Sequence, residues 1–150
     1  MFRIITRKWL DADAETCFDL ARSIDLHLES MGHTRERAVG GRVTGMIGPG
    51  ETVTWRARHF GCWFTMTSRI TAMQSPGYFR DEMLTGPFAR FSHAHFFQAA
   101  GSRTLMTDIV EVSVPWGFLG KLVGTLVLRR YLLRLIERRS DCIVAAARKS

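Results

Sequence analysis

The chain has 150 residues, enough for one domain with a substantial hydrophobic core, and we expect residues 1–150 to form a single domain. With 46% hydrophobic and 23% charged residues, the composition is that of a globular protein and excludes a disordered or fibrous chain. The three cysteines, Cys17, Cys62 and Cys142, are far apart and form no C-x-x-C pair, which argues against a disulfide framework or a zinc knuckle. The N-terminal stretch MFRIITRKWLDADAE lacks the apolar run of a signal peptide. We therefore expect a cytoplasmic protein.

The formal net charge of +7 raises the question of nucleic-acid binding. Many of the basic residues fall after residue 128, mostly on a predicted helix: Arg129, Arg130, Arg134, Arg138, Arg139, Arg148 and Lys149. The others are scattered, and no helix-turn-helix, zinc-finger or aromatic RNA-binding motif accompanies them. A basic helix face usually does no more than contact solvent, so we expect no nucleic-acid partner.

The first elements in chain order are a strand and two short helices. Residues 2–9 (FRIITRKW) alternate apolar and polar side chains, which is typical of a half-buried strand. Apolar residues then recur at helical spacing, and Asp13 supplies a helix start signal. Ser23 and Asp25 interrupt this pattern, which predicts two short helices that meet near residues 22–24.

Six strands are predicted next, separated by short turns that contain glycine or proline. They cover residues 36–47, 52–60, 62–73, 78–85, 88–98 and 104–114. Short turns of this kind join antiparallel neighbours, so consecutive strands should pair as hairpins. Residues 118–146 carry an apolar stripe opposite a charged face, which predicts one long amphipathic helix. A sheet has to bury one of its faces. This helix is the only long one predicted, so we expect it to cover the buried face of the sheet.

Three stretches carry a resemblance to a known superfamily: YFRDEMLTGPFARFSHAHFF (78–97), GSRTLMTDIVEVSVPWGFLGKL (101–122) and RRYLLRLIERR (129–139). Together with the element order, they resemble the START-like helix-grip superfamily, also called SRPBCC or polyketide cyclase/dehydrase-like, and within it a bacterial branch of small members without an agreed substrate. The resemblance implies an α+β fold in which a seven-stranded curved antiparallel sheet wraps around the long C-terminal helix. It also implies a hydrophobic cavity between sheet and helix, which in this superfamily holds lipids, sterols, polyketides or other apolar molecules.

Alternation along each strand predicts which side chains face the long helix. The inner set is mostly apolar but includes four titratable residues: Asp81, His93, His95 and Asp108. The apolar part of the predicted ligand-binding wall consists of Trp55, Phe64, Met66, Phe79, Met83, Met106 and Val110. Three residues at the start of the long helix complete the predicted set: Trp116, Phe118 and Leu122.

The four titratable residues have several interpretations. A buried charge without a partner is costly, so we expect them to pair with one another, with water or with a ligand. Such pairs join adjacent strands, anchor the polar end of a ligand, or catalyse a reaction with histidine as the proton carrier and aspartate setting its tautomer. Two histidines and a carboxylate also suit a metal ion, but a single H-x-H is a weak signal. We therefore expect neither a metal nor a cofactor.

The segment 116–128 (WGFLGKLVGTLVL) is apolar on nearly every side of the predicted helix. Burial between the sheet and neighbouring loops is one interpretation. The other is a mobile gate at the cavity entrance, near Trp116 to Gly124, or a surface in transient contact with a membrane whose anionic lipids engage the arginines downstream. The sequence leaves open whether the protein is a monomer or a homodimer.

The function that we expect is the binding, transport or sensing of a small hydrophobic ligand, such as a lipid, a polyketide-like molecule or an aromatic compound. Two alternatives stay open. One is an enzyme of the cyclase, dehydratase or hydrolase type that uses His93, His95, Asp81 or Asp108 in the same cavity. The other is an accessory protein whose surface binds a partner. A fold of this kind does not decide among these functions.

Overall fold

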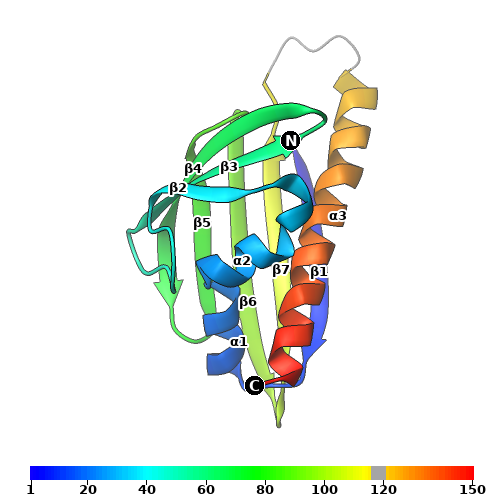
Figure 1. Ribbon diagram of the computed structural model, residues 1–150. Helices are drawn as coiled ribbons and strands as arrows, with labels where there is room; N and C mark the ends of the chain where they lie inside the picture. Colours follow the sequence, from blue (N-terminus) through cyan, green and yellow to red (C-terminus); the bar gives the residue numbers. More distant parts are fainter. Residues whose placement is uncertain (116–120) are drawn as a thin grey trace.

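One antiparallel sheet of seven strands runs through the structure (Figure 1). The computed structural model describes residues 1–115 and 121–150, with the backbone alone at 121–123. The strands are β1 (Phe2–Leu10), β2 (Arg37–Gly41), β3 (Thr52–His59), β4 (Cys62–Gln74), β5 (Tyr78–Thr85), β6 (Arg90–Ala100) and β7 (Arg103–Ser113). Their order in the sheet is β1-β7-β6-β5-β4-β3-β2, so β2 to β7 pair consecutively and β1 joins beside β7. The predicted antiparallel pairing of consecutive strands is confirmed.

Two short helices follow β1, and each begins at a side chain that caps its first turn. The helices are α1 (Ala14–Ala21), α2 (Ile24–Ser30), the 3-10 helix η1 (Gly32–Thr34) and α3 (Lys121–Arg148). Asp13 Oδ1 accepts a hydrogen bond from the Thr16 amide at 2.8 Å, and Ser23 Oγ accepts one from the Leu26 amide at 3.2 Å. These caps satisfy amides that the start of a helix leaves unpaired. The predicted break near residues 22–24 is therefore the end of α1 and the cap of α2.

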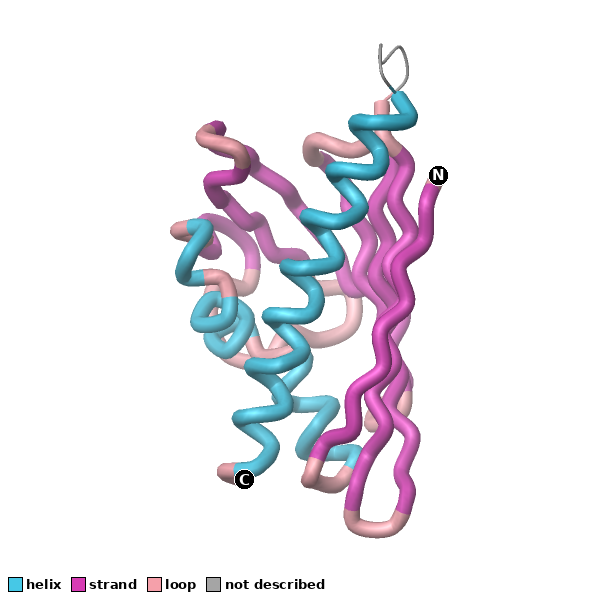
Figure 2. The backbone as a smooth tube through the Cα atoms, turned by 90° about the vertical axis from the view of Figure 1, so that its right-hand side faces the viewer, coloured by secondary structure: helices cyan, strands magenta, loops and turns pink. Residues whose placement is uncertain are grey.

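The long helix α3 lies across the concave face of the sheet and, among the strands, packs most closely against β1 (Figure 2). Lys8 on β1 forms ion pairs with Asp141 at 3.4 Å and Glu137 at 4.0 Å. A single long helix is confirmed, and it extends two residues beyond the predicted end at residue 146. The predicted start at 118 falls outside the described residues. Within residues 1–115 and 121–150, no helix has both the length and the hydropathy to cross a membrane.

Strand β2 is shorter than the strand predicted over residues 36–47. Its pairing with β3 shifts register between Ala38 and Gly40, and Gly41 has a φ of 69°. A Cβ at Gly41 would clash with the Thr52 carbonyl oxygen, so only glycine allows the two backbones to approach this closely. The chain therefore leaves the sheet at this residue and follows an irregular path to β3.

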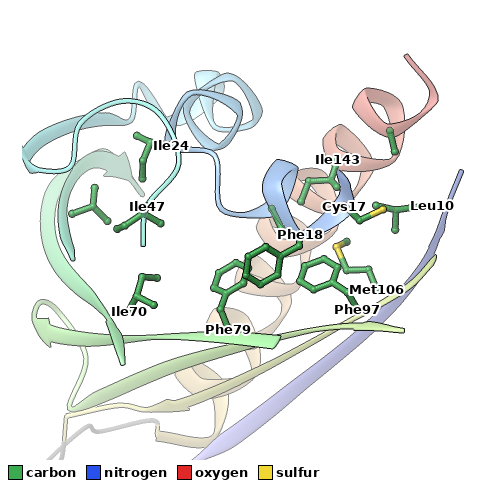
Figure 3. Close-up of a cluster of buried hydrophobic side chains, with 13 residues drawn as sticks. Leu10, Cys17, Phe18, Ile24, Ile47, Ile70, Phe79, Phe97, Met106 and Ile143 are labelled. Carbon is green, nitrogen blue, oxygen red and sulfur yellow. The ribbon is translucent and has the colours of Figure 1, made fainter. Parts of the chain in front are cut away.

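The larger buried apolar cluster lies between α1, the sheet and the C-terminal part of α3 (Figure 3). Phe18 on α1 points into it and contacts the rings of Phe79 and Phe97 edge-on, with centroids at 5.4 and 5.7 Å. Alternation predicts that Phe79 and Phe97 face inward, and both are buried. Through Phe18, the short helix α1 is thus fastened to the inner face of the sheet.

Replacement of Phe18 by alanine should destabilise the protein by about 3–5 kcal/mol, because the change removes a fully buried ring and leaves a cavity in the core. Urea unfolding followed by circular dichroism measures this loss. The matched control is Phe96→Ala, since Phe96 is 39% exposed, and its cost should be about 1 kcal/mol or less. Equal losses for the two variants would contradict the assignment of Phe18 to the core.

Candidate functional site

A cavity of about 310 Å³ lies between α3 and the inner faces of β3 to β6. Its wall is mostly aromatic and aliphatic, with additional side chains from α2. The predicted site residues that line it are Trp55, Phe64, Met66, Phe79, Asp81, His93 and His95. Strand alternation therefore locates one side of the cavity, because every second side chain of β3 to β6 points toward the helix.

Four predicted residues lie outside the cavity lining. Met106 is fully buried in the apolar cluster of Figure 3, and Val110 is fully buried in a second cluster with Ile4 on β1 and residues of α3. The reason is the position of β7 in the sheet. It lies next to β1, where α1 and α3 pack closely, so its inward side chains are buried in the apolar clusters and do not reach the cavity. The Met83 sulfur lies against Gly86, and Asp108 lies behind the two histidines.

The remaining predicted residues are Trp116, Phe118 and Leu122. Trp116 and Phe118 lie outside the described residues, and so does the side chain of Leu122. The expected entrance near Trp116 to Gly124 therefore stays a prediction.

The four titratable residues come together because of the strand register. Asp81 on β5 is directly opposite His93 on β6, and His95 on β6 is directly opposite Asp108 on β7. His93 Nε2 is hydrogen-bonded to Asp108 Oδ1 at 3.0 Å, and His95 Nε2 to Asp81 Oδ2 at 3.0 Å. His95 Nδ1 also lies 2.8 Å from Asp108 Oδ1, although this contact lacks the angle of a hydrogen bond. Of the partners expected for these four residues, the structure shows that they pair with one another.

The two imidazoles form a short column with an aromatic ring. The His93 and His95 rings stack with centroids 3.8 Å apart, and His95 stacks on Phe79 at 4.1 Å. His95 is 1% exposed and His93 is 8% exposed. The column holds both rings in place at the cavity wall.

Sequence reasoning missed Arg139. The basic helix predicts a solvated position for it, but it is 7% exposed and lines the cavity. Its Nη2 donates a hydrogen bond to the Ala21 carbonyl oxygen at 2.7 Å, and its Nη1 lies 3.9 Å from Asp108 Oδ1 without a hydrogen-bond partner. A signal for its position exists in the sequence, because Leu132, Ile136, Arg139 and Ile143 follow one another at helical spacing and form one inward stripe.

The charges of the cluster follow from burial and from these contacts. Burial alone would raise the pKa of Asp108, but the contacts with His93 and His95 outweigh it and hold the pKa well below its ordinary value. Burial also raises the pKa of Asp81, while the hydrogen bond with His95 and nearby positive charge lower it, with a net decrease. Burial is the main cause that lowers the pKa of His93 to about 4, and the neighbouring His95 adds to it. At neutral pH both carboxylates are charged and His93 is neutral.

A second polar group lines another part of the cavity and was not predicted. His27 Nε2 is paired with Glu36 Oε2 at 3.1 Å, and the His27 ring lies against Trp55 at a tilt of 30°, with centroids 4.2 Å apart. His59 Nδ1 is hydrogen-bonded to the Tyr131 hydroxyl. No spacing motif links these residues in the sequence, because they come from α2, β3 and α3 and from the loop before β2.

The pairing of Asp108 with Arg139 should be detectable as a coupling energy. Asp108→Asn leaves a guanidinium buried without its carboxylate, so we expect a loss of about 3–5 kcal/mol in the free energy of unfolding. The double variant with Arg139→Met should lose less than the sum of the single variants, by about 1–3 kcal/mol, as urea unfolding will measure.

The control cycle uses Arg3 and Glu111, an exposed ion pair at 3.2 Å, for which the coupling should stay below about 1 kcal/mol. Additive losses for Asp108 and Arg139 would show that the guanidinium does not stabilise the carboxylate.

Comparisons with known proteins agree on the fold. No family model and no curated protein matches the sequence. Among solved structures, the Zhui aromatase/cyclase from Streptomyces sp. R1128 is similar with a TM-score of 0.80 and 13% identity, over 99% of this chain and 94% of that one. TTHA0849 from Thermus thermophilus has a TM-score of 0.74 and 15% identity, over 97% of this chain and 99% of that one. A START superfamily protein from Mycobacterium smegmatis has a TM-score of 0.71 and 11% identity, over 98% of this chain and 97% of that one. This chain therefore has the START-like helix-grip fold that its motifs resemble.

Proposed function

We propose that the protein binds a small apolar molecule with one oxygen-bearing end, and carries or senses it. The observation that carries this proposal is the cavity of about 310 Å³, with apolar walls and a buried polar cluster on one side. A site of this size lies at the lower end of the usual range for small-molecule pockets, which are mostly apolar and contain a few polar groups that orient the ligand.

The apolar wall supplies the affinity in this proposal. Trp55, Phe64 and Met66 offer dispersion contacts and little hydrogen bonding. Burial of apolar ligand surface contributes about 25 cal/mol per Å², so ~300 Å² would contribute several kcal/mol before the costs of ordering. Methionine adapts to different shapes, so selectivity among apolar ligands should be loose.

The polar side of the cavity supports the oxygen-bearing end. Arg139 Nη1 and Ser68 Oγ are buried, belong to residues that line the cavity, and have no hydrogen-bond partner in the described part of the protein. A guanidinium can only donate, so a ligand atom that satisfies it has to be an acceptor such as a hydroxyl, carbonyl or carboxylate oxygen. A purely apolar ligand would leave this buried donor unpaired, which is costly.

A second candidate function is an enzyme in the same cavity, and one observation favours it. His95 lies between two carboxylates, with Nε2 bonded to Asp81 and Nδ1 close to Asp108. Histidine transfers protons near neutral pH, and a carboxylate on one ring nitrogen sets the tautomer. A structurally similar protein is an aromatase/cyclase, so cyclase or dehydratase chemistry is the reaction to test. The third candidate is an accessory protein without a ligand, for which we would expect an interior filled by side chains. The cavity argues against this candidate.

The polar end can be tested with two probes of similar size, 2-naphthol and 2-methylnaphthalene. We expect 2-naphthol to bind about tenfold more tightly in isothermal titration calorimetry, because a hydrogen bond with a charged donor contributes about 1.5 kcal/mol. Arg139→Met should bring the two affinities together. Equal affinities for the wild-type protein would contradict the assignment of the polar end.

The location of the ligand can be tested by filling the cavity. Ala57 is buried on β3 and lines the cavity, so Ala57→Phe should weaken the binding of 2-naphthol by tenfold or more in the same calorimetric assay. The matched control is Ala94→Phe, at a half-buried position of β6 outside the cavity lining, which should leave the affinity unchanged. Circular dichroism verifies that both variants fold. Equal affinities for the two folded variants would place the ligand elsewhere.

A further inference from the structure

We infer that Asp81, His93 and His95 form a binding site for a divalent transition-metal ion, open to the cavity. This inference goes beyond the proposed carrier function and does not rest on it. The H-x-H spacing alone is too weak to predict a metal, but the fold adds a third donor from the neighbouring strand. One ligand atom from each of the three residues lies within 4.8 Å of the other two.

One pair of ligand atoms already has the separation expected around a bound ion, and all three atoms lie within 4.8 Å of one another. Metal bonds of about 2.0–2.2 Å to imidazole nitrogen and carboxylate oxygen set ligand atoms about 3–3.5 Å apart. His95 Nε2 and Asp81 Oδ2 are already at 3.0 Å. Asp81 is the least buried member, with 24% of its side chain exposed, so a small rotation of its carboxylate is sterically open. An ion would then replace the hydrogen bond between these two atoms.

A carboxylate behind the rings prepares them for this role. A carboxylate accepts hydrogen bonds, so His93 donates to Asp108 through Nε2 and keeps the lone pair on Nδ1 for a metal. His95 presents Nδ1 to the same Asp108 oxygen at 2.8 Å, on the ring edge away from its Asp81 contact. Histidine ligands in metal sites are usually oriented by a carboxylate on the second ring nitrogen, as His93 is by its hydrogen bond with Asp108.

The charge of the cluster also favours a cation. The carboxylate of Asp108 has the Arg139 guanidinium as its counter-charge, at 3.9 Å. Asp81 has no lysine or arginine within ion-pair distance among the described residues and is paired only with His95. A cation bound beside Asp81 would give this carboxylate the positive partner that no lysine or arginine among the described residues supplies.

The donor set indicates the class of metal. Two imidazole nitrogens and one carboxylate suit Zn²⁺, Fe²⁺, Co²⁺ or Ni²⁺ and are a poor match for Mg²⁺ or Ca²⁺, which prefer oxygen. Three protein ligands leave at least one coordination position open, and the three residues line the cavity. A water molecule or the oxygen of a cavity ligand can occupy that position.

The test is titration of the EDTA-treated full-length protein with Co²⁺ alone and, separately, with Zn²⁺ alone. We expect one ion per chain by calorimetry with Zn²⁺ and a visible d–d absorption band with Co²⁺ that Zn²⁺ abolishes. Asp81→Asn, His93→Gln and His95→Gln should each weaken Zn²⁺ binding by more than about 100-fold, and Asp108→Asn by about 10–100-fold. His27→Gln is the control, because it removes a histidine from the other polar group of the cavity, and it should leave the affinity unchanged.

Histidine NMR spectra keep the test decisive if a variant does not fold. In the wild-type protein, substoichiometric Co²⁺ should shift or broaden the ring signals of His93 and His95 more than those of His27. Absence of saturable binding, or a dependence on His27 instead of His95, would overturn the inference. Binding of 2-naphthol in the presence of EDTA tests the carrier function separately, so either proposal can fail without the other.

Discussion

The burial of a single carboxylate, that of Asp108, constrains how the helix and the sheet fit together. A charge in the protein interior is stable only where polar partners surround it, and these come from two directions. His93 and His95 approach from the neighbouring strand β6, while Arg139 and Ser140 approach from α3. A one-residue slip of β6 would turn both histidines to the outer face, and a rotation of α3 would remove the guanidinium. Strand register and helix rotation therefore depend on the same buried charge.

The cavity exists because the sheet curves away from the helix on one side. α3 packs on β1, α1 and α2. It meets the end of β3 through the His59–Tyr131 hydrogen bond, and the space that the aromatic side chains line separates it from the rest of β3 and from β4. Apolar packing near β1 and the polar pairs at the centre hold the helix in place, so the far side does not have to be filled. The cavity is thus a consequence of uneven packing, since side chains fill the core near β1 and leave space near β3 and β4.

Much of the fold was predictable from local patterns, and parts of the site were not. Glycine and proline turns marked the strands, and alternation located the inner faces of Asp81, His93 and His95, because both signals are encoded in adjacent residues. Alternation assigns a face but not a position across the sheet, which is why Met106 was placed in the cavity although it is fully buried in the apolar cluster with Phe18 and Phe97. Arg139 was missed because a charged side chain on a basic helix is usually exposed, and only its partners across the fold explain its burial.

The open sheet has two edge strands, β1 and β2, and each is protected in a different manner. An exposed edge presents unpaired amides and carbonyls to which a strand of another molecule can add, the first step of edge-to-edge aggregation. α3 packs against β1, and Lys8 of that strand is tied to the helix by ion pairs. β2 has only five residues, contains a bulge and ends at a glycine with positive φ, so it offers no regular ladder to a second chain. Both ends of a sheet that encloses an apolar cavity are thus poorly suited to strand addition by a second chain.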